Sequence, residues 1–285
     1  MTAQATNITA APTLVRRLRF RVPLLVAFGL GWLGLMVFTA VFADVIRPYD
    51  VTQMDLSARL VGPLSPGHLL GTDELGRDVL SRLIQSIRVS LVIAFGATLL
   101  SAFFGTTLGF LAAQFRGTVE HLILVLADFQ AALPFLILSL AVLAFFGSSM
   151  TLLVGLMGFY GWERYARISR GLAISAGYAS AVVQLGANPS RVYLRHILPN
   201  VASTLIVSMT LTFPEIILME SGLSFLGLGV QPPESSLGNM VGFGREYLTR
   251  APWIMLGPAF VIMMTTLSIS LVGDWLRDKL DPTIR

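Results

Sequence analysis

Long stretches without a charged residue are the feature that most limits what this chain can fold into. Val22–Ala43 has no charge in 22 residues, Val89–Phe115 has none in 27, and Phe129–Trp162 has none in 34. A helix needs about 20 apolar residues to cross the hydrocarbon core of a bilayer. Only 13% of the residues are charged, about half the share in soluble domains. The sequence therefore disfavours a soluble all-α protein and predicts an all-α membrane protein.

Six transmembrane helices account for the apolar stretches. The 34-residue run is too long for one crossing, and Gly147 with the two serines after it divides the region into helices at about 122–146 and 150–167. A fifth span, 201–222, contains one proline and two glutamates, and a sixth covers 251–273. All but the fifth exceed the length expected of a spanning helix.

The arginines indicate how these spans are oriented. With six spans both termini lie on one side, and that side collects thirteen basic residues against seven on the other. Basic residues concentrate on the cytoplasmic side of membrane proteins. We therefore expect cytoplasmic N and C termini. The first apolar stretch is too long for a cleaved signal peptide, whose apolar region has about 7–15 residues, so we expect a retained helix.

The segment Gly71–Leu83 precedes the second span and has helical spacing of its apolar residues. Thr72 is a suitable N-cap, and Asp73 and Glu74 would lie in the first turn, where a helix favours anions. We expect an amphipathic helix here, which either only lies at the membrane surface or serves as a docking or subunit-contact element.

The inner segment 163–200 begins with three arginines spaced three residues apart. Gly186 is suited to end a first helical stretch, and Asn188-Pro189 is typical of the start of a second, from Pro189 to Leu198. Such a helix is either part of an ordinary loop or a projection that fits a groove on a partner.

Several motifs together resemble a known family. They are Gly71–Leu83, Leu185–Asn200, Leu223–Pro233, Gly238–Met240, Ala251–Trp253 and Gly273–Pro282. In order and sequence they are similar to the permease subunits of the dipeptide/oligopeptide/nickel class of bacterial ABC importers, over residues 45–285. The resemblance implies the type I ABC importer permease fold. It does not separate peptide permeases from nickel, glutathione or opine permeases.

The resemblance also implies a division of the chain. Residues 1–21 would be a cytoplasmic segment, 22–46 the first transmembrane helix, and 47–88 a periplasmic segment with the amphipathic helix. Residues 86–285 would form a five-helix core with a cytoplasmic coupling loop at 171–200 and a periplasmic loop at 223–250. We expect the protein in the bacterial inner membrane.

The implied partners are a second, related permease in a heterodimer, two cytoplasmic ABC ATPases and a periplasmic solute-binding protein, with lipid around the spans. The small net charge of +4 gives no reason to expect nucleic acid. The implied ATPase contact is the coupling loop. Its candidate residues are Tyr178, Ser180, Ala181, Val182, Gly186, Ala187, Arg191 and Arg195. The family pattern has Glu-Ala-Ala where this chain has Ser180-Ala181-Val182, so the resemblance predicts no charged contact at Ser180, a change that is compatible with packing into the ATPase groove. Our hypothesis is that coupling in this chain is co-adapted or reduced.

Catalytic chemistry of its own is not expected in this chain. The sequence has no phosphate-binding loop of the Gly-x-x-x-x-Gly-Lys-Ser/Thr type, and its one lysine is Lys279. It has no cysteine, and its three histidines are far apart. We therefore expect no cofactor and no metal here, with ATP and Mg²⁺ bound by the partner ATPases.

Three residues in or near the spans are candidates for the pathway or its gate: Asp128, Glu220 and Phe225. A charge at mid-membrane costs about 2.5–3.5 kcal/mol on insertion scales, so Asp128 should face protein or water, either in a structural ion pair or in the pathway. Glu220 matches an acidic family position, whereas Glu215 does not and should point elsewhere. Phe225 lies in the glycine-rich Leu223–Pro233, for which we expect a short re-entrant or interfacial helix.

Two other classes of protein compete with this interpretation. An ion-coupled secondary transporter would usually show mid-membrane coupling charges and internal symmetry, which are not evident. An intramembrane serine protease needs a serine with a base in the membrane, but all three histidines fall outside the predicted spans.

Overall fold

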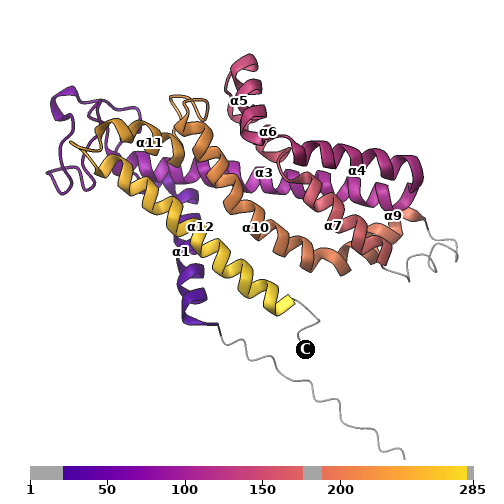
Figure 1. The fold of residues 1–285 in the computed structure, drawn as a ribbon. Coiled ribbons are helices and arrows are strands. Elements are labelled where there is room, and N and C mark those ends of the chain that lie inside the picture. Colours follow the sequence, from indigo (N-terminus) through magenta and orange to yellow (C-terminus); the bar gives the residue numbers. More distant parts are fainter. Residues whose placement is uncertain (1–21, 176–187, 281–285) are drawn as a thin grey trace, which may run out of the picture.

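The computed structural model describes residues 22–175 and 188–280. The regular secondary structure in these ranges is helical, and turns and loops join the helices. The longest helix, α3 (Val79–Phe115), extends across the molecule (Figure 1). Helices α1 (Leu24–Val41), α11 (Leu237–Gly244) and α12 (Trp253–Leu280) gather toward its beginning. Helices α4 (Gly117–Ala132) and α7 (Trp162–Ser175) lie toward its end, and α10 (Leu198–Phe225) runs between the two groups.

Helix α1 lies against α12 and is held to α3 by one arginine. Trp32 donates to Thr265 Oγ1 at 3.1 Å, and Gly29 lets the two backbones approach at Ser268. Arg88 of α3 donates to the Ala40 carbonyl at 2.7 Å, which satisfies an acceptor that the end of α1 leaves open. A short α2 (Ala43–Ile46) follows. The first apolar stretch is thus a helix docked on the core.

Glycines allow α3 to approach α7 (Trp162–Ser175) very closely. A Cβ placed on Gly105 would lie 2.2 Å from the Trp162 carbonyl oxygen, and one on Gly109 would lie 2.0 Å from Ser169 Oγ. Small residues four apart are the usual means of close helix contact in membranes. Beside them lies the main apolar core, whose largest fully buried side chains include Ile93, Leu143, Leu153, Met157, Ile216 and Ile217.

The third and fourth predicted spans are interrupted. Helices α4 (Gly117–Ala132) and α5 (Phe135–Phe146) meet at an angle of 87°, because Leu133 precedes a proline and adopts extended backbone. Helix α6 (Met150–Gly158) is separated from α7 by a turn in which Gly161 has φ +79°. In the described ranges four helices are each long and apolar enough to span a membrane, or five if the bent pair is one span, so six are not confirmed.

The fifth span is the end of a longer helical run. Helix α9 (Pro189–Val192), one π-helical turn η2 (Tyr193–Ile197) and α10 (Leu198–Phe225) follow one another without a break. The helix expected within Leu223–Pro233 does not form there. Leu223 to Phe225 complete α10, and the short helix α11 begins only at Leu237, capped by Ser236, with the 3₁₀ turn η3 (Arg245–Tyr247) after it.

The amphipathic helix expected from Thr72 is also corrected, because the helix begins at Val79. Asp78, not Thr72, is the N-cap and accepts a hydrogen bond from the Ser81 amide at 2.8 Å. Residues 71–78 form a tight turn, in which Gly76 has φ +71° and lies against the Asp55 carbonyl beside the 3₁₀ helix η1 (Leu56–Ala58). Asp73 stabilises this turn because its carboxylate binds other parts of the turn. It therefore does not begin a helix.

Candidate functional site

Asp73 is the centre of the turn before α3. It is fully buried and accepts hydrogen bonds from the Leu75 and Arg77 amides at 2.8 and 2.9 Å. Its other oxygen accepts from Arg77 Nε at 2.8 Å and from Arg82 Nη1. Arg82 is itself only 6% exposed. A buried charge requires a partner of this kind, so the turn and the first turns of α3 are held as one unit.

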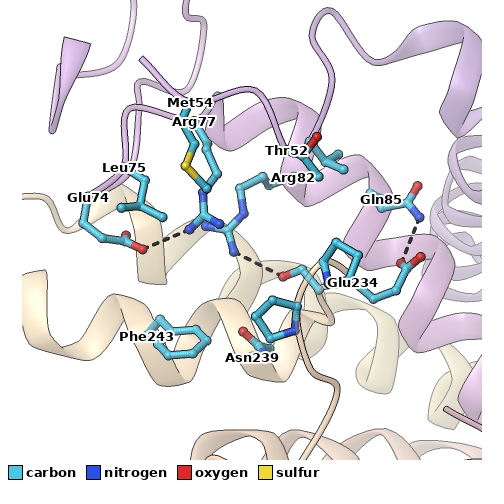
Figure 2. A pocket seen from close by; sticks show the side chains of 14 residues that line it. Thr52, Met54, Glu74, Leu75, Arg77, Arg82, Gln85, Glu234, Asn239 and Phe243 are labelled. Carbon is cyan, nitrogen blue, oxygen red and sulfur yellow. Dashed lines mark hydrogen bonds and ion pairs between the residues drawn. The ribbon is translucent and has the colours of Figure 1, made fainter. Parts of the chain in front are cut away.

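A cavity of about 470 Å³ lies beside this unit (Figure 2). Its wall is built by residues 51–54, by the turn and the start of α3, and by the segment that leads into α11. The lining residues are Val51, Thr52, Met54, Glu74, Leu75, Arg77, Arg82, Gln85, Pro232, Pro233, Glu234, Ser235, Asn239 and Phe243. Segments more than 140 residues apart in the chain thus form one recess, which both polar and apolar side chains line.

Two contacts across this recess link α3 to the segment before α11. Arg82 Nη2 donates to Ser235 Oγ at 3.4 Å, and Gln85 Nε2 donates to Glu234 Oε2 at 3.3 Å (Figure 2). Arg77 donates to Glu74 at 3.0 Å. The sequence pattern predicted Asp73 in the first turn of a helix and did not predict the recess. The combination of Gly71 and Gly76 around two acidic residues was the available signal for a turn.

Glu220 is buried where α10 meets α11, with 1% of its surface exposed. Ser224 donates to its Oε1 at 2.6 Å and lies 3.2 Å from the hydroxyl of Ser236, the N-cap of α11. Its Oε2 has no hydrogen-bond partner among the described residues. Glu220 therefore anchors the start of α11 to α10. Phe225 lies one turn later, 39% exposed, with the Arg245 guanidinium 4.6 Å from its ring centre.

Asp128 is in an ion pair with Arg167 of α7. Its Oδ1 accepts from Arg167 at 2.8 Å, and both side chains are largely exposed. The other arginines of α7 are paired as well, Arg170 with Glu120 of α4 and Arg164 with Glu215 of α10. Glu215 and Glu220 point apart, as expected. Helix α7 is thus tied to two neighbours by three ion pairs.

Of the eight residues predicted to contact the ATPase, two lie in the part of the chain that the structure describes. Tyr178, Ser180, Ala181, Val182, Gly186 and Ala187 lie outside the described residues. Arg191 and Arg195 are exposed at the beginning of the helical run that continues into α10. The ring of Tyr193 lies 5.2 Å from that of Phe110 on α3, which fixes this end of the run to the core. Within residues 22–175 and 188–280, no three metal-ligating side chains are grouped so that they could hold a metal ion.

Comparisons with known proteins agree with this architecture. Residues 105–285 match the family described as "Binding-protein-dependent transport system inner membrane component". The di/tripeptide transport system permease protein DppC of Pseudomonas aeruginosa is 38% identical over 265 residues, which cover 90% of this chain and 88% of that protein. The oligopeptide transport system permease protein OppC of Bacillus subtilis is 35% identical, with 94% and 88% covered.

Two further similarities extend the comparison. The glutathione transport system permease protein GsiD of Pectobacterium atrosepticum is 35% identical, with 88% of this chain and 84% of that protein covered. Among solved structures, a chain of the MetNI methionine ABC transporter in an inward-facing conformation aligns with a TM-score of 0.57 at 17% identity. The alignment covers 71% of this chain and 97% of that one, which shows a shared fold.

Proposed function

Because this chain belongs to the family of binding-protein-dependent transport system inner membrane components, we propose that it forms half of the pathway of an ATP-driven importer for peptides or similar small solutes. Peptides are favoured because the relatives above include di/tripeptide and oligopeptide permeases. Glutathione is the second candidate, since one relative carries that name. Nickel and opines belong to the same proposal as further alternatives.

The proposed assembly contains a second, related permease, two cytoplasmic ATPases that bind ATP and Mg²⁺, and a periplasmic solute-binding protein. The chain itself would be non-catalytic. Both termini and the 171–200 loop would be cytoplasmic, which the excess of arginines on that side supports. The recess lined by Arg82 and Glu234 would then lie on the periplasmic side, where the binding protein docks.

The observation that carries the proposal is the unbroken helical run from Pro189 to Phe225. Its beginning exposes Arg191 and Arg195, and its end holds the buried Glu220 and the contact with α11. Because the run is continuous, we infer that a displacement at the arginines reaches the joint of α10 with α11. The proposed gate is therefore the joint of α10 with α11, which includes Glu220 and Phe225.

Isolation of the tagged chain from its native membrane tests the proposal. A second permease, two ATPases and a binding protein that carries a bound peptide are expected to co-purify, and mass spectrometry would identify each. Recovery of the chain alone, together with solute uptake by that chain under an ion gradient, would instead indicate a secondary transporter.

A further inference from the structure

Helices α4 and α5 carry a row of exposed apolar side chains. On α4 these recur at spacings of three and four residues, which places them on one side of the helix. Two more follow on α5, beyond the bend. The six residues, which we call the α4–α5 face, are Leu122, Val125, Leu126, Phe129, Ile137 and Phe145.

Helix α5 points away from the rest of the fold. Figure 1 shows α4 along α3, whereas α5 turns off at the bend and projects from the molecule. Near its far end, Phe145 is 83% exposed. With 12 residues, α5 is about 18 Å long, well short of the roughly 30 Å of a hydrocarbon core. It therefore neither spans a bilayer alone nor buries its apolar side chains within its own fold.

The bend between the two helices is unsuited to contact with lipid. Leu133 has extended backbone, and no side chain in the described ranges caps the start of α5 after Pro134. The last carbonyls of α4 and the first amides of α5 have no partner within these helices. Unpaired backbone groups are too costly in hydrocarbon, so a break of this kind lies within protein or beside water.

An exposed ion pair adjoins the same face. Asp128 accepts a hydrogen bond from Arg167 at 2.8 Å, and 73% and 43% of the two side chains are exposed. Asp128 precedes Phe129 in α4, which puts it about 100° from that residue, at the edge of the face. Charges within a span face protein or water rather than lipid. The polar groups here disfavour lipid and the apolar row disfavours water, whereas a protein surface suits both.

We propose that the α4–α5 face is the surface that contacts the second permease of the importer. This inference rests on the proposed function and adds to it which part of this chain meets that partner. Together α4 and α5 form a candidate membrane span, so the partner here must be embedded in the membrane. The binding protein and the ATPases are soluble in the proposed assembly, which leaves the second permease.

The exposed side of α12 differs from this face and provides a control. Its exposed residues Leu256, Phe260, Met263 and Leu267 also recur at spacings of three and four residues. However, α12 is one helix throughout them, and Trp253–Gly273 contains no charge. Because no polar feature disfavours hydrocarbon there, we expect lipid on this side.

Photo-crosslinking of the assembled importer tests the proposal. Phe129 and Phe145, on the two sides of the bend, are replaced one at a time by p-benzoylphenylalanine, a photoreactive residue built on the phenylalanine side chain. The importer is irradiated in nanodiscs, and mass spectrometry identifies the adducts. The same replacement of Phe260 is the matched control, since Phe260 is 50% exposed and Phe129 is 63% exposed.

The variants at Phe129 and Phe145 should each form an adduct with the second permease, and the variant at Phe260 should form adducts with lipid alone. Two positions guard against poor folding of one variant, and ATP-driven uptake of dialanine before irradiation shows that each variant is correctly assembled. Adducts with lipid alone at Phe129 and Phe145, or with a second copy of this chain, would overturn the proposal. An adduct with the second permease at Phe260 alone would also overturn it.

The composition of the importer separates this inference from the proposed function. If the second permease co-purifies and uptake requires ATP, but neither variant is crosslinked to it, the α4–α5 face is not the contact and the proposed function stands. If the chain takes up dialanine without a second permease, the proposed function is wrong, and so is this inference.

Discussion

Arg82 and Asp73 form a buried ion pair although nine residues separate them, with side chains 7% and 0% exposed. The pair joins the turn before α3 to the helix itself, and it supports one wall of the recess that Ser235 and Glu234 close from the other side. The turn before α3 is therefore fixed to the helical core by electrostatics and not by apolar contact alone.

Arg82→Leu should destabilise the protein strongly, because Asp73 would lose a buried partner. Breaking a buried pair by removing one member typically costs 3–5 kcal/mol, which is about the effect expected here. Unfolding of the chain in mixed micelles measures it. Arg47→Leu is the matched control, since Arg47 is in a partly exposed pair with Asp44 at 3.5 Å and should cost less than about 1 kcal/mol. Equal losses in the two variants would contradict this account.

Gly105→Ala tests the close contact of α3 with α7. The new Cβ would lie 2.2 Å from the Trp162 carbonyl, so the helices must separate, at a cost of about 1–3 kcal/mol. The same measurement on Gly34→Ala in α1, where a Cβ meets nothing within 4 Å, should show no loss. A tolerated alanine at Gly105 would mean that α3 and α7 are farther apart than described.

Ser224→Ala should loosen α11. It removes the donor to Glu220 Oε1, and a buried acceptor without its donor costs about 1–3 kcal/mol. Backbone hydrogen exchange over Leu237–Gly244 should become about tenfold faster. Ser208→Ala is the control, because the Ser208 hydroxyl binds only the Thr204 carbonyl of its own helix. Unchanged exchange in α11 would show that Glu220 does not anchor it.

Acid should loosen the segment around Asp55. The hydrogen bond from the Ser57 hydroxyl holds the pKa of the Asp55 carboxyl below its usual value of 3.8. A lowered folded-state pKa means that this contribution to stability is present above the unfolded pKa and is lost as the pH falls through the folded one. Ser57→Ala should raise the Asp55 pKa toward 3.8, as carboxyl-carbon NMR would show. An unchanged pKa in this variant would contradict the assignment.

Sequence patterns predicted the helical class and the position of most apolar helices, because a bilayer imposes both length and composition. They did not predict where helices break. The bend at Leu133 follows from Pro134, a local signal that the apolar count overlooked. The turn before α7 includes Gly161 at φ +79°, and there the Tyr160 ring lies 4.7 Å from that of Phe135.

The candidate sites also include some features that the sequence predicts and others that it does not. The pair of Asp128 and the separation of Glu215 from Glu220 follow from helical spacing and the cost of a charge in a membrane. The ion pair of Asp73 with Arg82 depends on a turn within nine residues, where the spacing of apolar residues predicted a helix. The recess beside Glu234 depends on contacts across some 150 residues. No local pattern contains such contacts.

We propose that partner ATPases drive the conformational change of this chain through the helical run that begins at Pro189. ATP-driven uptake of dialanine by proteoliposomes containing the full importer tests it most directly. Charge reversal of Arg191 and Arg195 to glutamate should abolish uptake and its coupling to ATP hydrolysis. The equal change at the exposed Arg277 and Lys279 of α12 should leave both intact. Normal uptake with Arg191 and Arg195 reversed, or uptake by this chain alone without ATPases, would contradict the account.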